Sequence, residues 1–301
     1  IFWSFTFFLF YSCSVYRWFD GFCNDFDFFW DINYSCVSHA NNQKIYFNEL
    51  MVFLKTISFI FVSSFIVAQN GHEIALNIYT KQFPDDLTNT MNMKLVNSKN
   101  KIRNYTMKSR SIDKNRKQII WFLEPKSDMG ISFLKIEHKN RDDEMKMWLP
   151  AFKKIRRISS RKKGDSFMGS DLSYEDLSTR DMEDYLFNLK EDQNLNGKIY
   201  YTLESIPKKK LNSFYNSHVS LVDKITFNIV KEYSYDLNGK LLKEKEYTYK
   251  KIKMFDTLEY IKVFNVQKKH STQIKFTNIE VYKNISEDSF SEQNLKRIPA
   301  N

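Results

Sequence analysis

One stretch of the sequence could supply a nucleophile, because it begins like the catalytic block of a group of serine esterases. Residues 164–167 read Gly-Asp-Ser-Phe, which would make Ser166 the attacking hydroxyl. Such a serine needs a histidine as general base, and these esterases place an aspartate three residues before that histidine. Neither His218 nor His270 has an aspartate at that position. The pattern is therefore incomplete, and we expect a protein that is not an enzyme.

The sequence also lacks the spacings that hold metal ions or nucleotides. His72, His138, His218 and His270 each stand alone, with no second histidine or cysteine at a ligand spacing. The glycines form no phosphate-binding loop. We therefore expect no metal and no cofactor.

A run of basic residues is the strongest charged feature of the chain. Seven Lys and Arg residues crowd the eleven positions that begin at Lys153. Side chains alternate between the two faces of a strand, so Lys154 and Arg156 would share one face, and Lys153 and Arg157 the other. These four cations could bind an anionic headgroup or an acidic partner, each contributing about 1 kcal/mol near an anionic surface. The alternative is a solvated edge strand whose lysines prevent sheets from pairing edge to edge.

Apolar and aromatic residues flank this basic run. Trp148 and Leu149 end a predicted strand before it, whereas Phe167, Met168 and Tyr174 follow it. Thioether and aromatic side chains adapt to the shape of a hydrocarbon guest, so these five residues are candidates for contact with acyl chains. The alternative is that they belong to the ordinary core of the protein.

The first fifty residues differ from the rest of the chain. Segment 1–50 holds all three cysteines and an excess of acids over bases, and its aromatic residues follow neither a helical nor a strand period. We interpret this segment as a spurious upstream extension, with the true start at Met51. The alternative is a membrane-associated tail.

Residues 51–68 have the pattern of a cleaved signal peptide. Lys55 supplies a short basic start, and the apolar run from Ile57 to Val67 is too short to span a bilayer. The small residue Ala68 precedes the polar Gln69, so we expect cleavage between these two residues and export to the periplasm.

Residues 69–301 would then form the mature domain, and its composition restricts its chemistry and its partners. It contains no cysteine, so neither disulfides nor thiol chemistry are available to it. The whole chain carries a net charge of +10 at pH 7, and the domain is more basic still because segment 1–50 is acidic. Export excludes nucleic acid as the partner of this charge and favours anionic headgroups or an acidic protein surface.

The pattern of 69–301 predicts a mainly β fold with a few helices. Apolar and polar residues alternate along successive segments joined by turns, among which Asn238-Gly239 is a hairpin signal. Helices are expected at 73–83, near 173–190 and at 286–296. Strands are expected at 90–96, 102–110, 118–123, 131–136, 145–149, 198–204, 225–229, 241–249, 258–266 and 273–282. The strand at 225–229 is expected to lead on through Tyr233 and Tyr235 to the hairpin. One face of the resulting sheet would be apolar and only partly covered.

Residues 147–177 carry a resemblance to a known family. They include Trp148-Leu149-Pro150, the pair Arg156-Arg157, and Phe-Met-Gly-Ser-Asp-Leu-Ser-Tyr-Glu-Asp at 167–176. This block resembles the signature of the outer-membrane lipoprotein-sorting protein family, the LolA-like group. It departs from the usual pattern by lacking one Tyr in the strand and by having Leu172 in place of Phe. The resemblance extends more weakly over nearly all of residues 70–298.

The resemblance implies a fold and a function. The fold is α+β, mainly β: a strongly curved antiparallel sheet that forms an unclosed half barrel with a few covering helices. The function is that of a periplasmic carrier or receptor, which shelters acyl chains of a lipoprotein or lipid in an apolar concavity. Its partners would include an inner-membrane transporter or an outer-membrane acceptor. The alternative is an envelope adaptor that docks a membrane transporter through the basic strand and carries no lipid.

Overall fold

The computed structural model describes residues 70–139 and 141–298, which belong to the second of two compact units, Gln69–Asn301. The predicted upstream extension (1–50), the predicted signal peptide (51–68) and its cleavage point between Ala68 and Gln69 lie outside the described residues.

Strands make up most of the described chain, and all of them belong to one sheet. They are β1 (Asp86–Val96), β2 (Ile102–Ile112), β3 (Lys117–Glu124), β4 (Ser132–Ile136), β5 (Glu144–Leu149), β6 (Lys154–Ile158), β7 (Tyr185–Leu195), β8 (Lys198–Pro207), β9 (Ser217–Asp223), β10 (Ile229–Tyr235), β11 (Leu241–Ile252), β12 (Phe255–Asn265) and β13 (His270–Val281). Within the described residues there are two α-helices, α3 (Gly71–Tyr79) and α4 (Glu292–Leu295). Short 3-10 turns are η1 (Pro150–Phe152), η2 (Ser160–Lys162), η3 (Glu175–Leu177), η4 (Met182–Asp184), η5 (Lys209–Leu211) and η6 (Glu287–Ser289).

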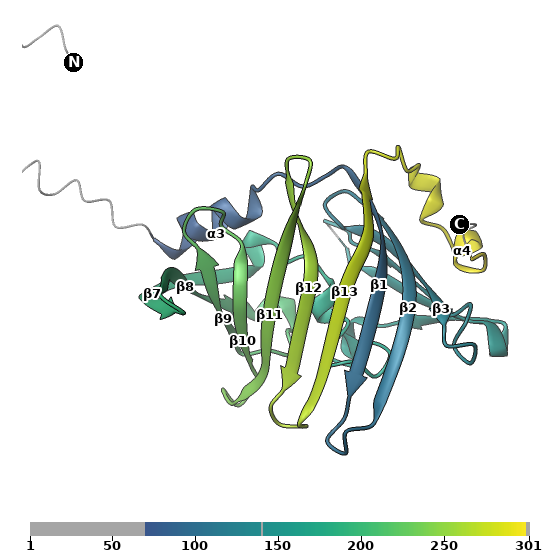
Figure 1. Ribbon diagram of the computed structural model, residues 1–301, viewed down its shortest axis with the longest axis horizontal. Coiled ribbons are helices and arrows are strands. Elements are labelled where there is room, and N and C mark those ends of the chain that lie inside the picture. The colour runs from purple at the N-terminus through teal and green to yellow at the C-terminus, as the bar shows by residue number, and fades with distance from the viewer. Residues whose placement is uncertain (1–69, 140, 299–301) are drawn as a thin grey trace, which may run out of the picture. The chain divides into compact units, whose positions relative to one another are not determined.

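The sheet is antiparallel and bends without closing into a barrel (Figure 1). Its strand order is β6-β5-β4-β3-β2-β1-β13-β12-β11-β10-β9-β8-β7, so the first and last strands of the chain pair in the middle. Antiparallel pairs of consecutive strands generate the rest of the order, within β1–β6 and within β7–β13. The predicted mainly β half barrel is confirmed.

The strand order requires one long connection between the two edges of the sheet. Strands β6 and β7 follow one another in sequence but lie at opposite edges. The residues between them, 159–184, must therefore cross from one edge to the other, and we call them the crossing segment. The crossing segment lies against the concave side of the sheet, which we call the inner face.

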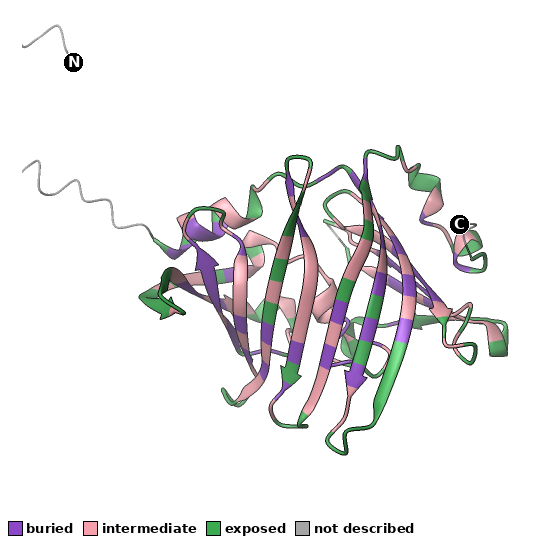
Figure 2. Cartoon of the chain, viewed as in Figure 1, coloured by how far each residue is buried: buried purple, intermediate pink, exposed green. Residues whose placement is uncertain are grey.

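The two faces of the sheet have separate apolar cores. Burial alternates along β1, as expected for a strand with one covered face (Figure 2). The inner core includes Met93, Phe122 and Phe133, all almost fully buried. On the outer face, α4 packs Leu295 against Trp121 in a smaller core. The main core is therefore on the inner face, beneath the crossing segment.

Three sequence-based expectations about elements need correction. The helix predicted near 173–190 is absent: this stretch forms η3 and η4 and then enters β7. The strand expected at 225–229 is mostly a turn, because the Asp223 carboxylate accepts the backbone N–H groups of Ile225 and Thr226 and holds the chain in a bend. Strand β9 was not predicted.

Helix α3 covers the inner face of β7, β8 and β9. Its residues Ile74 and Ala75 pack against Leu203 and Val222. At its first residue, Gly71, an added Cβ would lie 2.8 Å from backbone atoms of β7. The close approach of helix and strand thus requires glycine at this position.

We predict that Gly71→Ala lowers the free energy of unfolding by about 2 kcal/mol, because the new methyl group must push the helix away from β7. Chemical denaturation measures this change. The exposed neighbour His72 is the control, and His72→Ala should change the free energy of unfolding by less than about 0.5 kcal/mol. Equal effects of the two substitutions would contradict the close packing described.

Candidate functional site

The apolar half of the inner face is rich in methionine. Met91, Met93, Met107, Met145 and Met147 are buried in it, and Met168 packs against its border. These are six of the ten methionines in the chain. Methionine is flexible and polarizable, so a core built from it can repack around guests of different shape.

The crossing segment supplies the other wall of this core. Its buried residues Phe167, Leu172 and Tyr174 pack onto the sheet. The ring of Phe167 meets that of Phe133 edge to face, with centroids 5.3 Å apart, and the ring of Tyr174 at 5.9 Å. The protein's own side chains thus fill much of the concave side. The expectation of an apolar face covered only thinly by helices must be corrected, since an irregular segment does most of the covering.

The structure brings together four of the five residues predicted to contact acyl chains. Phe167 and Tyr174 lie in the inner core, and Leu149 and Met168 are half-buried at its border. Trp148 is separated from them because successive strand residues point to opposite faces. It packs against the outer core, where the Lys296 ammonium lies 5.5 Å from the centre of its ring.

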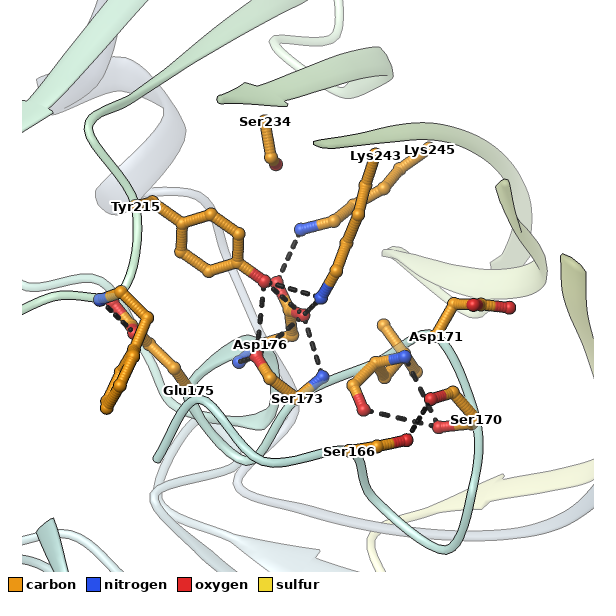
Figure 3. Close-up of polar contacts among 12 residues, drawn as sticks. Ser166, Ser170, Asp171, Ser173, Glu175, Asp176, Tyr215, Ser234, Lys243 and Lys245 are labelled. Carbon is orange, nitrogen blue, oxygen red and sulfur yellow. Dashed lines mark hydrogen bonds and ion pairs between the residues drawn. The ribbon is translucent and has the colours of Figure 1, made fainter. Parts of the chain in front are cut away.

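Beside the apolar half, the inner face carries a cluster of buried charges that we call the ion cluster (Figure 3). Lys243 and Lys245 point inward from β11 and meet the Asp176 carboxylate of the crossing segment at 2.8 and 2.5 Å. The Tyr215 hydroxyl accepts from the Lys243 ammonium at 2.6 Å and donates to Asp176 at 2.8 Å. Glu232 on β10 accepts from Lys245 at 3.1 Å. The side chains of both carboxylates and of Lys245 are almost fully buried.

The charges in the ion cluster determine one another's protonation. Burial alone would raise the pKa of Asp176, but Lys245 and Lys243 hold that pKa well below its usual range. Burial likewise opposes ionisation of Glu232, yet the nearby Arg180 and Lys245 keep the pKa of Glu232 well below normal. Both acids are therefore ionised at neutral pH, and the cluster is a set of paired charges.

His218 adds a neutral group to the ion cluster. It is 1% exposed, and its Nδ1 lies 2.9 Å from the Ser234 hydroxyl. Burial and the Arg180 guanidinium lower the pKa of His218 well below its ordinary value. The imidazole is thus uncharged in the folded protein at neutral pH.

A second set of polar contacts holds the later part of the crossing segment. The buried Lys135 ammonium on β4 donates to the Leu177 carbonyl at 2.7 Å and to the Glu137 carboxylate at 2.6 Å. The same carboxylate accepts the backbone N–H of Thr179 at 2.8 Å. Arg180 then pairs with Glu232. The crossing segment is therefore fixed to both halves of the sheet by buried charges.

The first part of the basic run forms β6, the strand at one edge of the sheet, as the edge-strand alternative requires. Met147, an inner-core residue, pairs with Arg156, so Arg156 and Lys154 lie on the inner face. Arg157 points to the outer face, and Lys153 lies in the turn before the strand. All four are exposed, and none has a carboxylate partner among the described residues. The structure thus divides this predicted set of cations between the two faces.

The groups considered for catalysis have other partners. The Ser166 hydroxyl donates to the Ser170 carbonyl. His270 lies 2.6 Å from Asp171 through Nδ1, and the same carboxylate accepts the Thr272 hydroxyl at 2.7 Å. In the part of the chain that the structure describes, no group of three or more His, Cys, Asp or Glu is arranged to hold a metal ion. Nor does any helix of that part have the length and apolar character needed to cross a membrane.

Comparison with known proteins identifies the family. A family model described only as an uncharacterized protein matches residues 114–297. The structure of a putative outer-membrane lipoprotein-sorting protein domain from Vibrio parahaemolyticus is similar at 32% identity, with 75% of this chain and 98% of that chain covered and a TM-score of 0.71. The chain belongs to the outer-membrane lipoprotein-sorting protein family, the LolA-like group. The predicted resemblance is thereby confirmed.

Two further solved structures are similar to this chain. A DUF1329 family protein from Desulfovibrio piger is 27% identical, with 75% of this chain and 97% of that chain covered and a TM-score of 0.71. A LolA superfamily protein from Nitrosomonas europaea, at 17% identity and a TM-score of 0.61, shares the fold over 75% of this chain and all of that chain. Among proteins with a curated functional description, none matches the sequence significantly.

The LolA-like block has a structural explanation in this fold. Its basic pair lies on the edge strand, its Phe167 and Tyr174 complete the inner core, and its Asp176 enters the ion cluster. Sequence reasoning missed Lys243, Lys245 and Glu232, the partners of that aspartate. The alternation of residues around Glu232 and around Lys243 and Lys245 predicted strands. Alternation alone does not tell which face of a strand is covered.

We predict that Asp176→Asn lowers the free energy of unfolding by about 3 to 5 kcal/mol, because the buried Lys243 ammonium loses its carboxylate partner and Lys245 keeps only Glu232. Asp192→Asn is the matched control: it removes the pair with Lys224, in which both side chains are partly exposed, and should change the free energy of unfolding by less than about 1 kcal/mol. Urea denaturation measures both. Similar small effects for the two variants would show that the ion cluster does not hold the crossing segment.

We predict that the stability of the wild-type protein falls by about 2 kcal/mol between pH 7 and pH 5 through His218 alone. A histidine whose folded-state pKa is depressed stabilises the fold above its unfolded-state pKa of about 6.5, and this contribution is lost as the pH falls. His218→Gln should remove this part of the pH dependence, as measured by denaturation at several pH values. An unchanged pH dependence would rule out the neutral, buried imidazole.

Proposed function

We propose that this protein is a carrier or receptor in the cell envelope, which shelters acyl chains of a lipoprotein or lipid against the apolar half of its inner face. Membership of the lipoprotein-sorting family supports a carrier-type role. The observation that carries the proposal is the methionine-rich inner core, closed on one side by an irregular segment. Such a core suits guests that differ in length and saturation.

The guest would enter at the half-buried border of the inner core. Leu149, Met168, Ile261 and Phe276 are partly exposed there and continue the buried apolar surface. Phe167 would give way to an acyl chain because it belongs to the crossing segment, which has little regular secondary structure of its own. Displacing one apolar side chain by another costs little, provided that the core remains filled.

The cations on the inner side of the edge strand suit the polar end of such a guest. Lys154 and Arg156 lie on the same face as Leu149, at the margin of the apolar surface. Burial raises the pKa of Tyr174, and the Arg156 guanidinium opposes this, which indicates that Arg156 lies near the inner core. We propose that these two cations attract an anionic headgroup while the chains lie over the core.

The location and partners follow from the same proposal. Residues 51–68 would direct export and be removed between Ala68 and Gln69, which leaves residues 69–301 as a periplasmic protein. An inner-membrane transporter would deliver the lipoprotein or lipid, and an outer-membrane acceptor would receive it. Sequencing the N-terminus of the protein isolated from cells tests the cleavage point, and a first residue other than Gln69 would contradict it.

The test of acyl binding is native mass spectrometry of the purified protein with extraction and identification of bound lipid. We expect acyl-bearing lipid on the wild type and an occupancy about tenfold lower for Leu149→Gln combined with Met168→Gln, because each change places a polar group where the chains would lie. Trp148→Gln is the control, since Trp148 is the neighbour of Leu149 on the opposite face, and it should retain the lipid.

Two results would reject this function. One is a wild-type protein that binds no acyl-bearing molecule after isolation or after incubation with lipid. The other is an equal loss of lipid in the Trp148 control. A protein that captures a transporter through the basic strand but never carries lipid would instead be the adaptor that the sequence left as the alternative.

A further inference from the structure

The turn between β5 and β6 presents a large aromatic side chain to solvent. Pro150, Ala151 and Phe152 form the 3-10 turn η1, which Lys153 closes in a left-handed conformation with φ 46°. The Lys153 N–H donates back to the Pro150 carbonyl at 3.1 Å, so the turn is tight. Phe152 at its tip is 71% exposed. A phenyl ring held in water on a tight turn contributes nothing to the core.

Exposed cations follow this ring along the chain. Lys153, Lys154, Arg156 and Arg157 are all exposed, and so are Arg161 and Lys162 in η2. None of these six has a carboxylate partner within the ranges that the structure describes, and no acid occurs between residues 147 and 164. The β5–β6 turn and the edge strand after it therefore form a basic surface with one apolar tip.

We infer that the β5–β6 turn and strand β6 dock the protein onto the surface of an anionic phospholipid bilayer. The Phe152 ring would enter the boundary between headgroups and acyl chains, and the cations would lie among the headgroup phosphates. This docking is separate from the proposed acyl binding, because Phe152 lies outside the inner core.

The distribution of the charges fits a membrane better than a folded protein partner. The cations point from both faces of β6 and from the turns at its two ends, so they do not converge on one ligand group. A bilayer offers diffuse negative charge and needs no fixed geometry of pairing. The charged side chains of the edge strand, Lys154, Arg156 and Arg157, also discourage strand addition by another protein.

Docking in this way would orient the carrier. Leu149, at the border of the inner core, directly precedes the turn that carries Phe152. Contact of the turn with a bilayer would therefore bring the border of the proposed acyl site to the membrane surface. An acyl chain could then pass between the bilayer and the proposed acyl site without crossing water.

The experiment is co-sedimentation of the purified protein with vesicles of phosphatidylcholine alone or with about 30 mol% phosphatidylglycerol. We expect binding to the anionic vesicles only. The triple variant Lys153→Gln, Lys154→Gln and Arg157→Gln should bind about 100-fold more weakly, and added salt should weaken the wild type. Phe152→Ser should reduce the binding about fivefold, with little dependence on salt.

A matched control lies at the other end of the strands from the β5–β6 turn. The β11–β12 turn has exposed Lys250, Lys251 and Lys253 beside Met254, which is 60% exposed. Replacing these three lysines by Gln removes the same charge, and Met254→Ser removes a similar apolar tip. We expect both control variants to bind anionic vesicles within about twofold of the wild type.

Equal weakening by the two triple variants would overturn the inference, because it would show only a general attraction of a basic protein. So would a wild-type protein that ignores anionic vesicles but is retained by an acidic envelope protein. All exchanged side chains are exposed, so melting temperatures should match the wild type. Bound acyl lipid, measured separately, should persist in Phe152→Ser, which distinguishes failure of docking from failure of the proposed function.

Discussion

The path of the chain between the two edges of the sheet constrains the rest of the structure. Thirteen strands spaced about 4.8 Å apart would place the edges of a flat sheet about 58 Å from each other. The crossing segment contains several tight turns and cannot be fully extended. Bending the sheet shortens its route, and the same bend creates a concave face that the segment must cover. The half barrel and its irregular cover thus have one cause.

The ion cluster gives the crossing segment a defined position. Buried ion pairs often add little net stability, but they restrict how the groups around them can be arranged. Here Asp176 can satisfy both lysines of β11 in only one register of the segment, and Lys135 fixes the residues that follow. The cluster also divides the inner face. In the order of the sheet, apolar side chains dominate on the strands from β5 through β1 and β13 to β12, and charged side chains dominate on β11 and β10. Helix α3 covers the inner face at the β7 edge.

Much of the fold could be predicted from the sequence, and the predictions that failed share a physical reason. Alternation identified most strands because one face is buried, and the block at 147–177 indicated the family. The helix expected near 173–190 failed because acids at a helix start and acids that pair with distant lysines look alike in sequence. Asp176 finds its partners at Lys243 and Lys245, which only the folded sheet brings near. Alternation along the predicted strand 145–149 places Trp148 and Leu149 on opposite faces, but it does not tell which of the two faces the inner core covers.

Site-specific photo-crosslinking in living cells tests the central claim most directly. A photoreactive residue at position 168 would lie at the border of the inner core, and one at position 148 would lie on the outer face. We predict adducts that contain acyl chains from position 168 and none from position 148. Absence of acyl adducts at 168, or equal yields at both positions, would contradict the account of a guest held against the inner face.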